Sequence, residues 1–167
     1  MLNNKDYPAL GFNFNITSFP TNPFEASYAF IPSDSFFQSV SGIKATVGES
    51  VVVNSGFNNS QYKLPTGTTY PDLVLTRGLT NNISDLGYWC HNFLNQQGQQ
   101  YDKIQTRTVT VMLLGGSILN ILMAWNFYDC YPKELEVGAF NADKSELAIE
   151  TLTIAYSRME KMSNLLG

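Results

Sequence analysis

The fold of this chain is constrained most by two strand-like segments that flank a long hairpin. The first segment ends at Val40-Ser41-Gly42-Ile43, and the second is Tyr70–Gly78, in which alternate residues from Leu73 to Arg77 share one face. Such alternation is typical of strands with one buried face. The sequence therefore predicts a strand, an extended hairpin and a second strand.

The hairpin between these segments is predicted in three parts. Ile43–Val53 forms its outgoing strand, in which Gly48 marks a β-bulge. Asn54–Ser60 forms its turn, because Gly and Asn tolerate positive φ more readily than other residues. Gln61–Leu64 forms the return strand, which we expect to break at Pro65.

The β-branched run at the end of the outgoing strand allows two interpretations. Ser50–Val53 contains three consecutive valines and no charged residue. It is either an ordinary buried strand or an edge that pairs with a neighbouring subunit, since unpaired strand edges recruit other strands.

The N-terminal part combines one strand with a segment of unusual composition. Phe12–Ile16 alternates apolar and polar residues, which predicts a half-buried strand. Thr17–Ser35 holds three prolines and four aromatic residues. The prolines argue against regular structure, and the aromatic residues argue against a flexible linker. We therefore expect an ordered loop that packs on another surface.

A helix is predicted in the middle of the chain. Its apolar residues are spaced by three and four, which places them on one helical face, and Asp85 is favourable in the first turn. Asn82 or Ser84 can cap its N-terminus, and Gly98 can end it. The apolar stripe consists of Leu86, Trp89, Cys90, Phe93 and Leu94. We expect this helix to cover the open end or the side of a small barrel.

A second hairpin is predicted after the helix. Thr108–Leu114 and Ile121–Phe127 each alternate in hydrophobicity, and a Gly115-Gly116 turn connects them. Tyr128–Phe140 is predicted as an irregular crossing because it contains Pro132.

The C-terminal residues are less clearly patterned. Leu147–Tyr156 fits a helix by its apolar spacing and a strand by its content of Thr and Ile. Ser157–Gly167 is predicted as a short helix or a frayed end.

The composition bounds the class of protein. The chain has 167 residues, which suits one domain, and 44% of them are hydrophobic, which is enough for a core. Charged residues make up only 14%, compared with about 25% in ordinary proteins. The surface is then either neutral and polar by itself or covered by partners.

Charge and the apolar runs argue against several partners. The net charge is −4 and the ten Lys and Arg residues are scattered, so a surface for specific nucleic-acid binding is not evident. The N-terminus lacks the apolar segment of a signal peptide, and the longest apolar run, Ile118–Trp125, is too short to span a bilayer. We expect synthesis in the bacterial cytoplasm, no direct membrane anchor, and Cys90 and Cys130 as free thiols.

Residues for catalysis or metal binding are sparse. The one histidine, His91, follows Cys90 directly, and adjacent helical residues point about 100° apart, so the two do not form a dyad. His91 is expected at the surface or rim. No spacing typical of a metal, nucleotide or nucleophile-elbow motif is present.

The acidic residues do not change this interpretation. We interpret the four most concentrated ones as scattered surface acids and not as a glycosidase pair; they are Glu134, Glu136, Glu146 and Glu150. We therefore expect no catalytic residue, no cofactor and no metal, and a function that arises from how the strands assemble.

Taken together, the segments of this chain resemble the tail tube proteins of contractile phages, including the inner tube proteins of extracellular contractile injection systems. The similarity extends from about Val40 to Tyr156, and the order and spacing of the segments are more specific than any one of them. The matching segments are Phe37, Val40–Ile43, Lys63–Pro65, Tyr70–Gly78, Leu86–Leu94, Ala124-Trp125 and Glu146–Leu152.

The resemblance implies a mainly β fold, a small β-barrel or two-sheet sandwich with one packed α-helix. One tail-tube-like domain would cover residues 1–167, with an aromatic and proline-rich insertion at 17–35, an extended hairpin at 47–62 and a C-terminal tail at 157–167. The resemblance also favours a strand for Leu147–Tyr156. The insertion departs from the family, which usually has a shorter connection there.

The resemblance further implies a structural function. Six copies would form a ring, and stacked rings would form an inner tube that conducts DNA or effector cargo, with sheath, baseplate and hub proteins as partners. Residues at family positions would maintain the fold; they are Val40, Ser41, Gly42, Leu64, Pro65, Tyr70, Pro71, Arg77, Gly78, Trp125, Pro132 and Glu150. Contacts between subunits or rings are expected at Phe19, Phe24, Tyr28, Val51, Val52, Val53 and Phe57.

Two other interpretations remain open. The first is a ring of the same fold that initiates the tube on the baseplate, which the aromatic insertion favours because an adaptor meets two unlike partners. The second is a monomeric β-sandwich module that binds a ligand such as a sugar through exposed aromatic side chains.

Overall fold

The computed structural model describes residues 12–21, 34–54, 56, 61–79, 85–96, 105–115, 120–138 and 148–162. The fold is mainly β with one helix among these residues, as the sequence predicts. The elements are β1 (Phe12–Pro20), β2 (Asp34–Ser41), β3 (Thr46–Asn54), β4 (Gln61–Thr69), β5 (Leu73–Gly78), α1 (Asp85–Gln96), β6 (Arg107–Gly115), β7 (Ile121–Val137), β8 (Ile149–Ala155) and β9 (Arg158–Met162).

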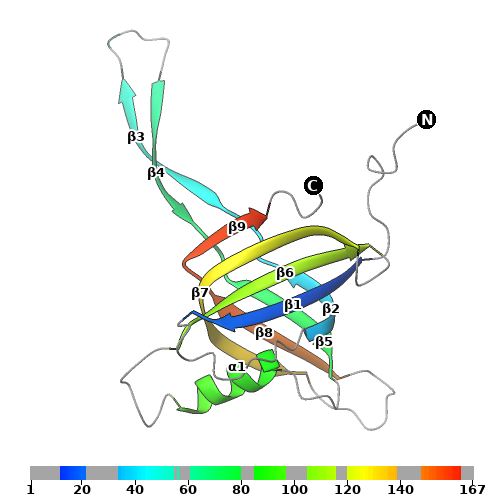
Figure 1. Cartoon of the computed structure of the whole chain (residues 1–167). Helices are drawn as coiled ribbons and strands as arrows, with labels where there is room; N and C mark the ends of the chain where they lie inside the picture. Colours follow the sequence, from blue (N-terminus) through cyan, green and yellow to red (C-terminus); the bar gives the residue numbers. More distant parts are fainter. Residues whose placement is uncertain are drawn as a thin grey trace, which may run out of the picture.

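Six of the strands close into a barrel (Figure 1). Hydrogen-bonded neighbours follow the order β6-β1-β2-β5-β8-β7, and β7 pairs again with β6, so that the sheet returns to its first strand. All of these pairings are antiparallel. Strands β8 and β9 pair with successive parts of β7. Tyr131 of β7 lies opposite Ala155 of β8, and Tyr128 of β7 lies opposite Arg158 of β9. The prediction of a small barrel is therefore confirmed.

Strands β3 and β4 form a two-stranded ribbon that projects from one end of the barrel (Figure 1). The register shifts between Val47 and Glu49, which confirms a bulge at Gly48. The predicted strand start at Ile43 is wrong, since β3 begins at Thr46. The reason is a tight turn before it, in which Gly42 has a φ of 90° and the Lys44 N–H donates to the Gly42 carbonyl at 2.8 Å.

The predicted break at Pro65 is also wrong, because β4 continues to Thr69. Pro65 lies opposite Glu49, next to a register shift between Glu49 and Val51. A proline is tolerated at a bulge or on an edge strand, where its missing N–H removes no hydrogen bond from the ladder. Both conditions hold in a ribbon of two strands.

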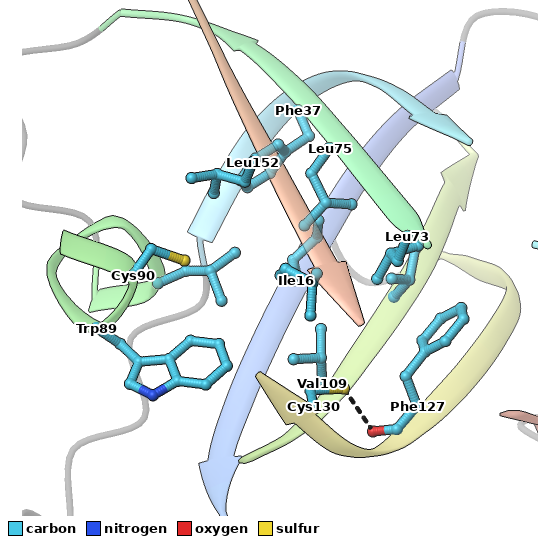
Figure 2. Packing of buried hydrophobic residues seen from close by; sticks show 13 residues of the cluster. Ile16, Phe37, Leu73, Leu75, Trp89, Cys90, Val109, Phe127, Cys130 and Leu152 are labelled. Carbon is cyan, nitrogen blue, oxygen red and sulfur yellow. Dashed lines mark hydrogen bonds between the residues drawn. The ribbon is translucent and has the colours of Figure 1, made fainter. Parts of the chain in front are cut away.

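The barrel interior is filled by one apolar core, to which every barrel strand and α1 contribute (Figure 2). The alternation predicted from Leu73 to Arg77 is confirmed, since every second residue of β5 is buried. Leu86, Trp89 and Cys90 bring the predicted helical stripe into this core, and α1 lies at the end of the barrel opposite the ribbon (Figure 1). The remaining buried members are Ile16, Phe37, Leu73, Leu75, Val109, Val111, Phe127, Cys130, Leu152 and Ile154.

One segment predicted as irregular is a strand at both ends. Thr17–Pro20 belongs to β1 and pairs with β6 as far as Pro20 opposite Arg107, whereas Asp34 and Ser35 begin β2. Pro20 is compatible with β1 because it is the last residue of that strand. Residues 22–33 lie outside the described residues.

The predicted irregular crossing at Tyr128–Phe140 is wrong as far as Val137, because β7 continues to that residue. Asp129 adopts a φ of 53°, and the register with β8 shifts between Pro132 and Glu134. These two irregularities let the strand bend and accommodate Pro132 without ending. Cys130 therefore lies within β7.

The C-terminal segments resolve in favour of strands. Leu147–Tyr156 contains β8, which confirms the strand that the resemblance favours. The prediction of a short helix or frayed end after it is wrong for Arg158–Met162, which forms β9; its Met159 packs against the core and its backbone pairs with β7. The predicted caps at Asn82, Ser84 and Gly98, and Gly116 of the predicted turn, lie outside the described residues.

Candidate assembly surfaces

Two of the family-matching residues form an ion pair inside the barrel. Arg77 on β5 and Glu150 on β8 are direct cross-strand neighbours, and the Arg77 Nε donates to Glu150 Oε2 at 2.6 Å. Their side chains are only 8% and 11% exposed. The guanidinium also lies 5.1 Å from the ring centre of Phe37 on β2. Glu150 is therefore not a scattered surface acid, and the sequence signal for this was its inward-facing position in the pattern of β8.

The base of the ribbon is held by a second set of family-matching residues. A Cβ on Gly42 would lie 2.0 Å from the carbonyl oxygen of Asp72, so no other residue fits there. The Tyr156 hydroxyl donates to the Gly42 carbonyl at 3.1 Å, and its ring lies 5.6 Å from that of Tyr70. Burial raises the pKa of Tyr156, which keeps this hydroxyl a donor. Lys133 pairs with Asp72 at 2.6 Å on the outer side.

A polar cluster connects the N-terminus of α1 to the barrel. Arg107 on β6 donates to Asp85 Oδ2 at 2.7 Å and to Ser18 Oγ at 3.0 Å, and its guanidinium lies 5.1 Å from the ring of Trp89. Asp85 is in the first turn of the helix, where a carboxylate also interacts favourably with the helix dipole. His91 is exposed, and its Nε2 lies 3.0 Å from the Asn95 side-chain amide nitrogen one turn further along the helix, which confirms its expected surface position.

Among the residues that the structure describes, the barrel contains one four-stranded sheet whose two outer edges have no partner strand. In the described residues, Tyr131–Val137 of β7 pairs only with β8, and Ser39–Ser41 of β2 pairs only with β5. The sheet between these edges has the order β2-β5-β8-β7. Because β3 follows β2, the β2 edge continues into the ribbon. Pairing along β7 could not be predicted while Tyr128–Phe140 was interpreted as irregular.

The outer face of this sheet is covered by small, mostly uncharged side chains. Residues at the same register level form two rows across the four strands, and the core residues Leu75 and Leu152 lie between these rows on the opposite face. The rows are Ser41–Val74–Thr153–Glu134 and Ser39–Thr76–Thr151–Glu136. Only the β7 edge of each row carries a charge.

The other family-matching residues lie in three places. Val40 and Trp125 pack against the core, and the Pro132 side chain is fully buried. Ser41 and Gly78 are the last residues of β2 and β5, and Tyr70 and Pro71 lie in the link between β4 and β5. Leu64 and Pro65 lie in the ribbon. Leu64 is 50% exposed, and Val47, which also lies in the ribbon, is 55% exposed. The ribbon positions are therefore not core positions.

The residues expected at subunit contacts are placed only in part. Phe19 lies on β1 and is 38% exposed. Val51, Val52 and Val53 belong to β3 in the projecting ribbon. Phe24, Tyr28 and Phe57 lie outside the described residues.

Chemical sites are not evident in the described residues. No group of three or more His, Cys, Asp or Glu residues is placed there to hold a metal ion. Cys90 and Cys130 are both buried and not disulfide-bonded. No helix in this part of the chain has the length and apolar character needed to cross a membrane.

Several solved structures share this fold. A chain in the cryo-EM structure of the anti-feeding prophage baseplate has a TM-score of 0.73 at 23% identity, over 96% of this chain and 99% of that one. A chain in the sheath–tube terminator of the PVC extracellular contractile injection system has a TM-score of 0.69 at 19% identity, over 95% and 99%. A chain in the PVC sheath–tube complex has a TM-score of 0.68 at 20% identity, over 95% and 94%.

A comparison with curated protein sequences found no significant match. The family profile described as T4-like virus tail tube protein gp19, in contrast, matches residues 11–160, which include every strand of the barrel. A match of this extent determines membership and agrees with the shared fold. The chain belongs to the T4-like virus tail tube protein gp19 family.

Proposed function

We propose that this chain is the subunit of the inner tube of a contractile tail or injection system. Six copies form a ring, rings stack into a tube, and the tube conducts DNA or effector cargo when a surrounding sheath contracts. The single observation that carries the proposal is the four-stranded sheet with an unpaired edge on each side. The chain would be made in the cytoplasm and function in a phage tail or in a released or anchored particle.

The two edges are suited to pairing with each other in different copies. The strands of the sheet alternate in direction from β2 to β7, so that β2 and the C-terminal half of β7 run antiparallel. Placing the β7 edge of one copy beside the β2 edge of the next therefore continues the antiparallel ladder. Such a head-to-tail contact closes into a ring when the rotation between copies allows it. Closure removes both exposed edges.

The position of the core determines which face of the sheet lines the channel. One face carries the rest of the barrel and α1, which take up more space than the sheet itself (Figure 1). In a closed ring of sheets the larger body fits on the outer side, where the circumference is greater. The rows of Ser, Thr, Val and Glu then face the lumen. Short polar side chains without a basic residue would let cargo pass without binding.

The ribbon supports contacts beyond the ring. It projects from the barrel, and its Val47 and Leu64 are about half exposed. Exposed apolar side chains on a projecting ribbon are suited to contact with the next ring. Sheath, baseplate and hub proteins would be the remaining partners, and the matching PVC structure is itself a sheath–tube complex.

Negative-stain electron microscopy with size-exclusion chromatography of the purified chain tests the proposal. Sixfold rings or hollow tubes are expected, and long tubes would identify the main tube subunit. A monomer that stays monodisperse at high concentration would contradict the proposal and favour a ligand-binding module.

A second candidate is a ring of the same fold that initiates the tube on the baseplate. It is favoured by the likeness to a chain of the anti-feeding prophage baseplate, which was solved with six-fold symmetry. The long segment at 17–35 is consistent with an adaptor. Isolated rings that do not stack in the same micrographs would support this candidate over the main tube subunit.

A further inference from the structure

Most of the charged side chains that the structure describes are paired within the chain. The pairs are Glu49–Lys63, Asp72–Lys133, Arg77–Glu150, Asp85–Arg107 and Arg158–Glu160. Lys44, Asp129, Glu134, Glu136 and Lys161 differ, since none of them has an ion-pair partner in the described ranges. Three of them, Lys44, Glu134 and Glu136, lie on the edges of the four-stranded sheet. All three are exposed.

These three residues are divided between the two unpaired edges of the four-stranded sheet. Glu134 and Glu136 lie on the β7 edge, opposite Thr153 and Thr151 of β8. Lys44 lies on the other edge, in the link between β2 and β3. The acidic edge and the basic edge are therefore on opposite sides of one sheet.

The acidic edge lies level with the end of β2, from which the short link to Lys44 starts. Register pairs place Glu134 level with Ser41 across the sheet, and Lys44 is three residues beyond Ser41. Strands in a closed barrel are tilted, which shifts adjoining edges by a few residues along the axis. Lys and Glu side chains are long enough to meet across such a shift.

We propose that, in the ring, Lys44 of one copy pairs with Glu134 and Glu136 of the adjacent copy and sets the register of the seam. This inference rests on the proposed ring and names its contact residues. Backbone pairing alone permits edges to slip or to choose another edge. Two β7 edges facing each other would oppose like charges, which is unfavourable. Charge complementarity therefore selects the β2 edge of a second copy as the partner.

Two charge-reversal variants test the proposal. Lys44→Glu makes both edges acidic, and Glu134→Lys with Glu136→Lys makes both edges basic. Each variant alone places like charges at every seam, so the concentration needed for ring formation should rise by roughly tenfold or more. An equimolar mixture should restore rings, because copies that alternate around a ring of even number have opposite charges at every seam.

The control is Lys161→Glu, which reverses an exposed charge on β9, away from both edges. It should form rings like the unaltered chain. Circular dichroism and thermal unfolding should show that every variant is folded. Native mass spectrometry should detect equal numbers of both variants in the rings of the mixture.

The outcomes separate this inference from the proposed function. Rings of the unaltered chain, loss of rings in both variants and recovery in the mixture support the seam. Normal assembly of either variant alone, or failure of the folded variants to assemble when mixed, would overturn the seam while the ring proposal stands. If the unaltered chain forms no ring under any condition, the proposed function fails and the seam fails with it.

Discussion

Arg77 on β5 and Glu150 on β8 form an ion pair inside the barrel, with 2.6 Å between Arg77 Nε and Glu150 Oε2. The Arg77 guanidinium also lies 5.1 Å from the ring centre of Phe37, which belongs to the apolar core. A buried charge is tolerated when its partner is held in good geometry, and it becomes costly when that partner is removed. The two residues therefore depend on each other.

Glu150→Gln should destabilise the fold, because it removes the buried carboxylate that accepts a hydrogen bond from Arg77 Nε. We expect the free energy of unfolding to fall by about 3–5 kcal/mol, measured by urea denaturation. Glu49→Gln is the matched control; its ion pair with Lys63 is about 60% exposed, so a change below about 1 kcal/mol is expected. Arg77→Met with Glu150→Leu should cost less than Glu150→Gln alone. Equal losses for the exposed and buried pairs would refute this account.

Gly42→Ala should displace the base of the ribbon. The added methyl group would lie 2.0 Å from the Asp72 carbonyl oxygen at a φ of 90°, and we expect a loss of about 1–3 kcal/mol in thermal or urea unfolding. Gly67→Ala is the control, since a methyl group there has no neighbour within 4 Å. Comparable stability of the two variants would show that the turn at Gly42 is not constrained.

Cys130 should make stability depend on alkaline pH. Burial raises the pKa of its thiol from 9.0 to about 12, so the folded state holds the proton more tightly than the unfolded state. Its contribution is fully present below about pH 9 and is lost as the pH rises towards 12. Between pH 8 and 11 the urea midpoint of the wild type should fall more than that of Cys130→Ala.

The reactivity of the thiol gives an independent measurement. In a Cys90→Ala background, iodoacetamide should modify Cys130 at pH 8 only after denaturation. Rapid labelling of the native protein, or identical pH profiles for Cys130→Ala and the wild type, would contradict the assignment.

Val52→Asp should block assembly without unfolding the monomer. Val52 is opposite Lys63 in the ribbon, which forms a sheet separate from the barrel strands, so a charge there should leave the thermal midpoint nearly unchanged. It should prevent contact with the next ring, which electron microscopy would reveal as the loss of tubes. Asn95→Asp on the exposed end of α1 adds the same charge elsewhere and should assemble normally. Normal tubes from Val52→Asp would exclude the ribbon from the contact.

The elements with one buried face could be predicted from local sequence. In β5 and α1, burial alternates with the period of the element, so that the pattern of Leu73 and Leu75, or of Leu86 and Cys90, indicates both type and orientation. The same alternation places Arg77 on the inner face. Its partner Glu150 could not be identified, because cross-strand pairing depends on strand order.

The elements that were missed depend on interactions distant in sequence. Strand β7 passes through Asp129 at positive φ and through Pro132, either of which locally suggests an end. It continues because β8 and β9 supply partners along one side. Strand β9 is short and mostly exposed, so it has no hydrophobic period to detect. The two unpaired edges follow from this topology and were therefore not predictable either.

The expectation of a structural protein without enzymatic activity is confirmed by membership of a tail tube family. The scarcity of catalytic and metal-binding motifs could be recognised from the sequence without the family, but it could not by itself identify a function. Order and spacing of strand motifs identified the family, whereas the edges suggest how its fold is used here.

The ribbon leaves the barrel at one end, and α1 lies at the other (Figure 1). A ring built by rotation alone would therefore present all of its ribbons on the same side. A stack of such rings is a polar filament, because every ring has the same orientation along the axis. Its two ends would add subunits at different rates, and two columns could not fuse with their ribbon-bearing ends together. The direction of travel through the tube would thus be specified within a single subunit.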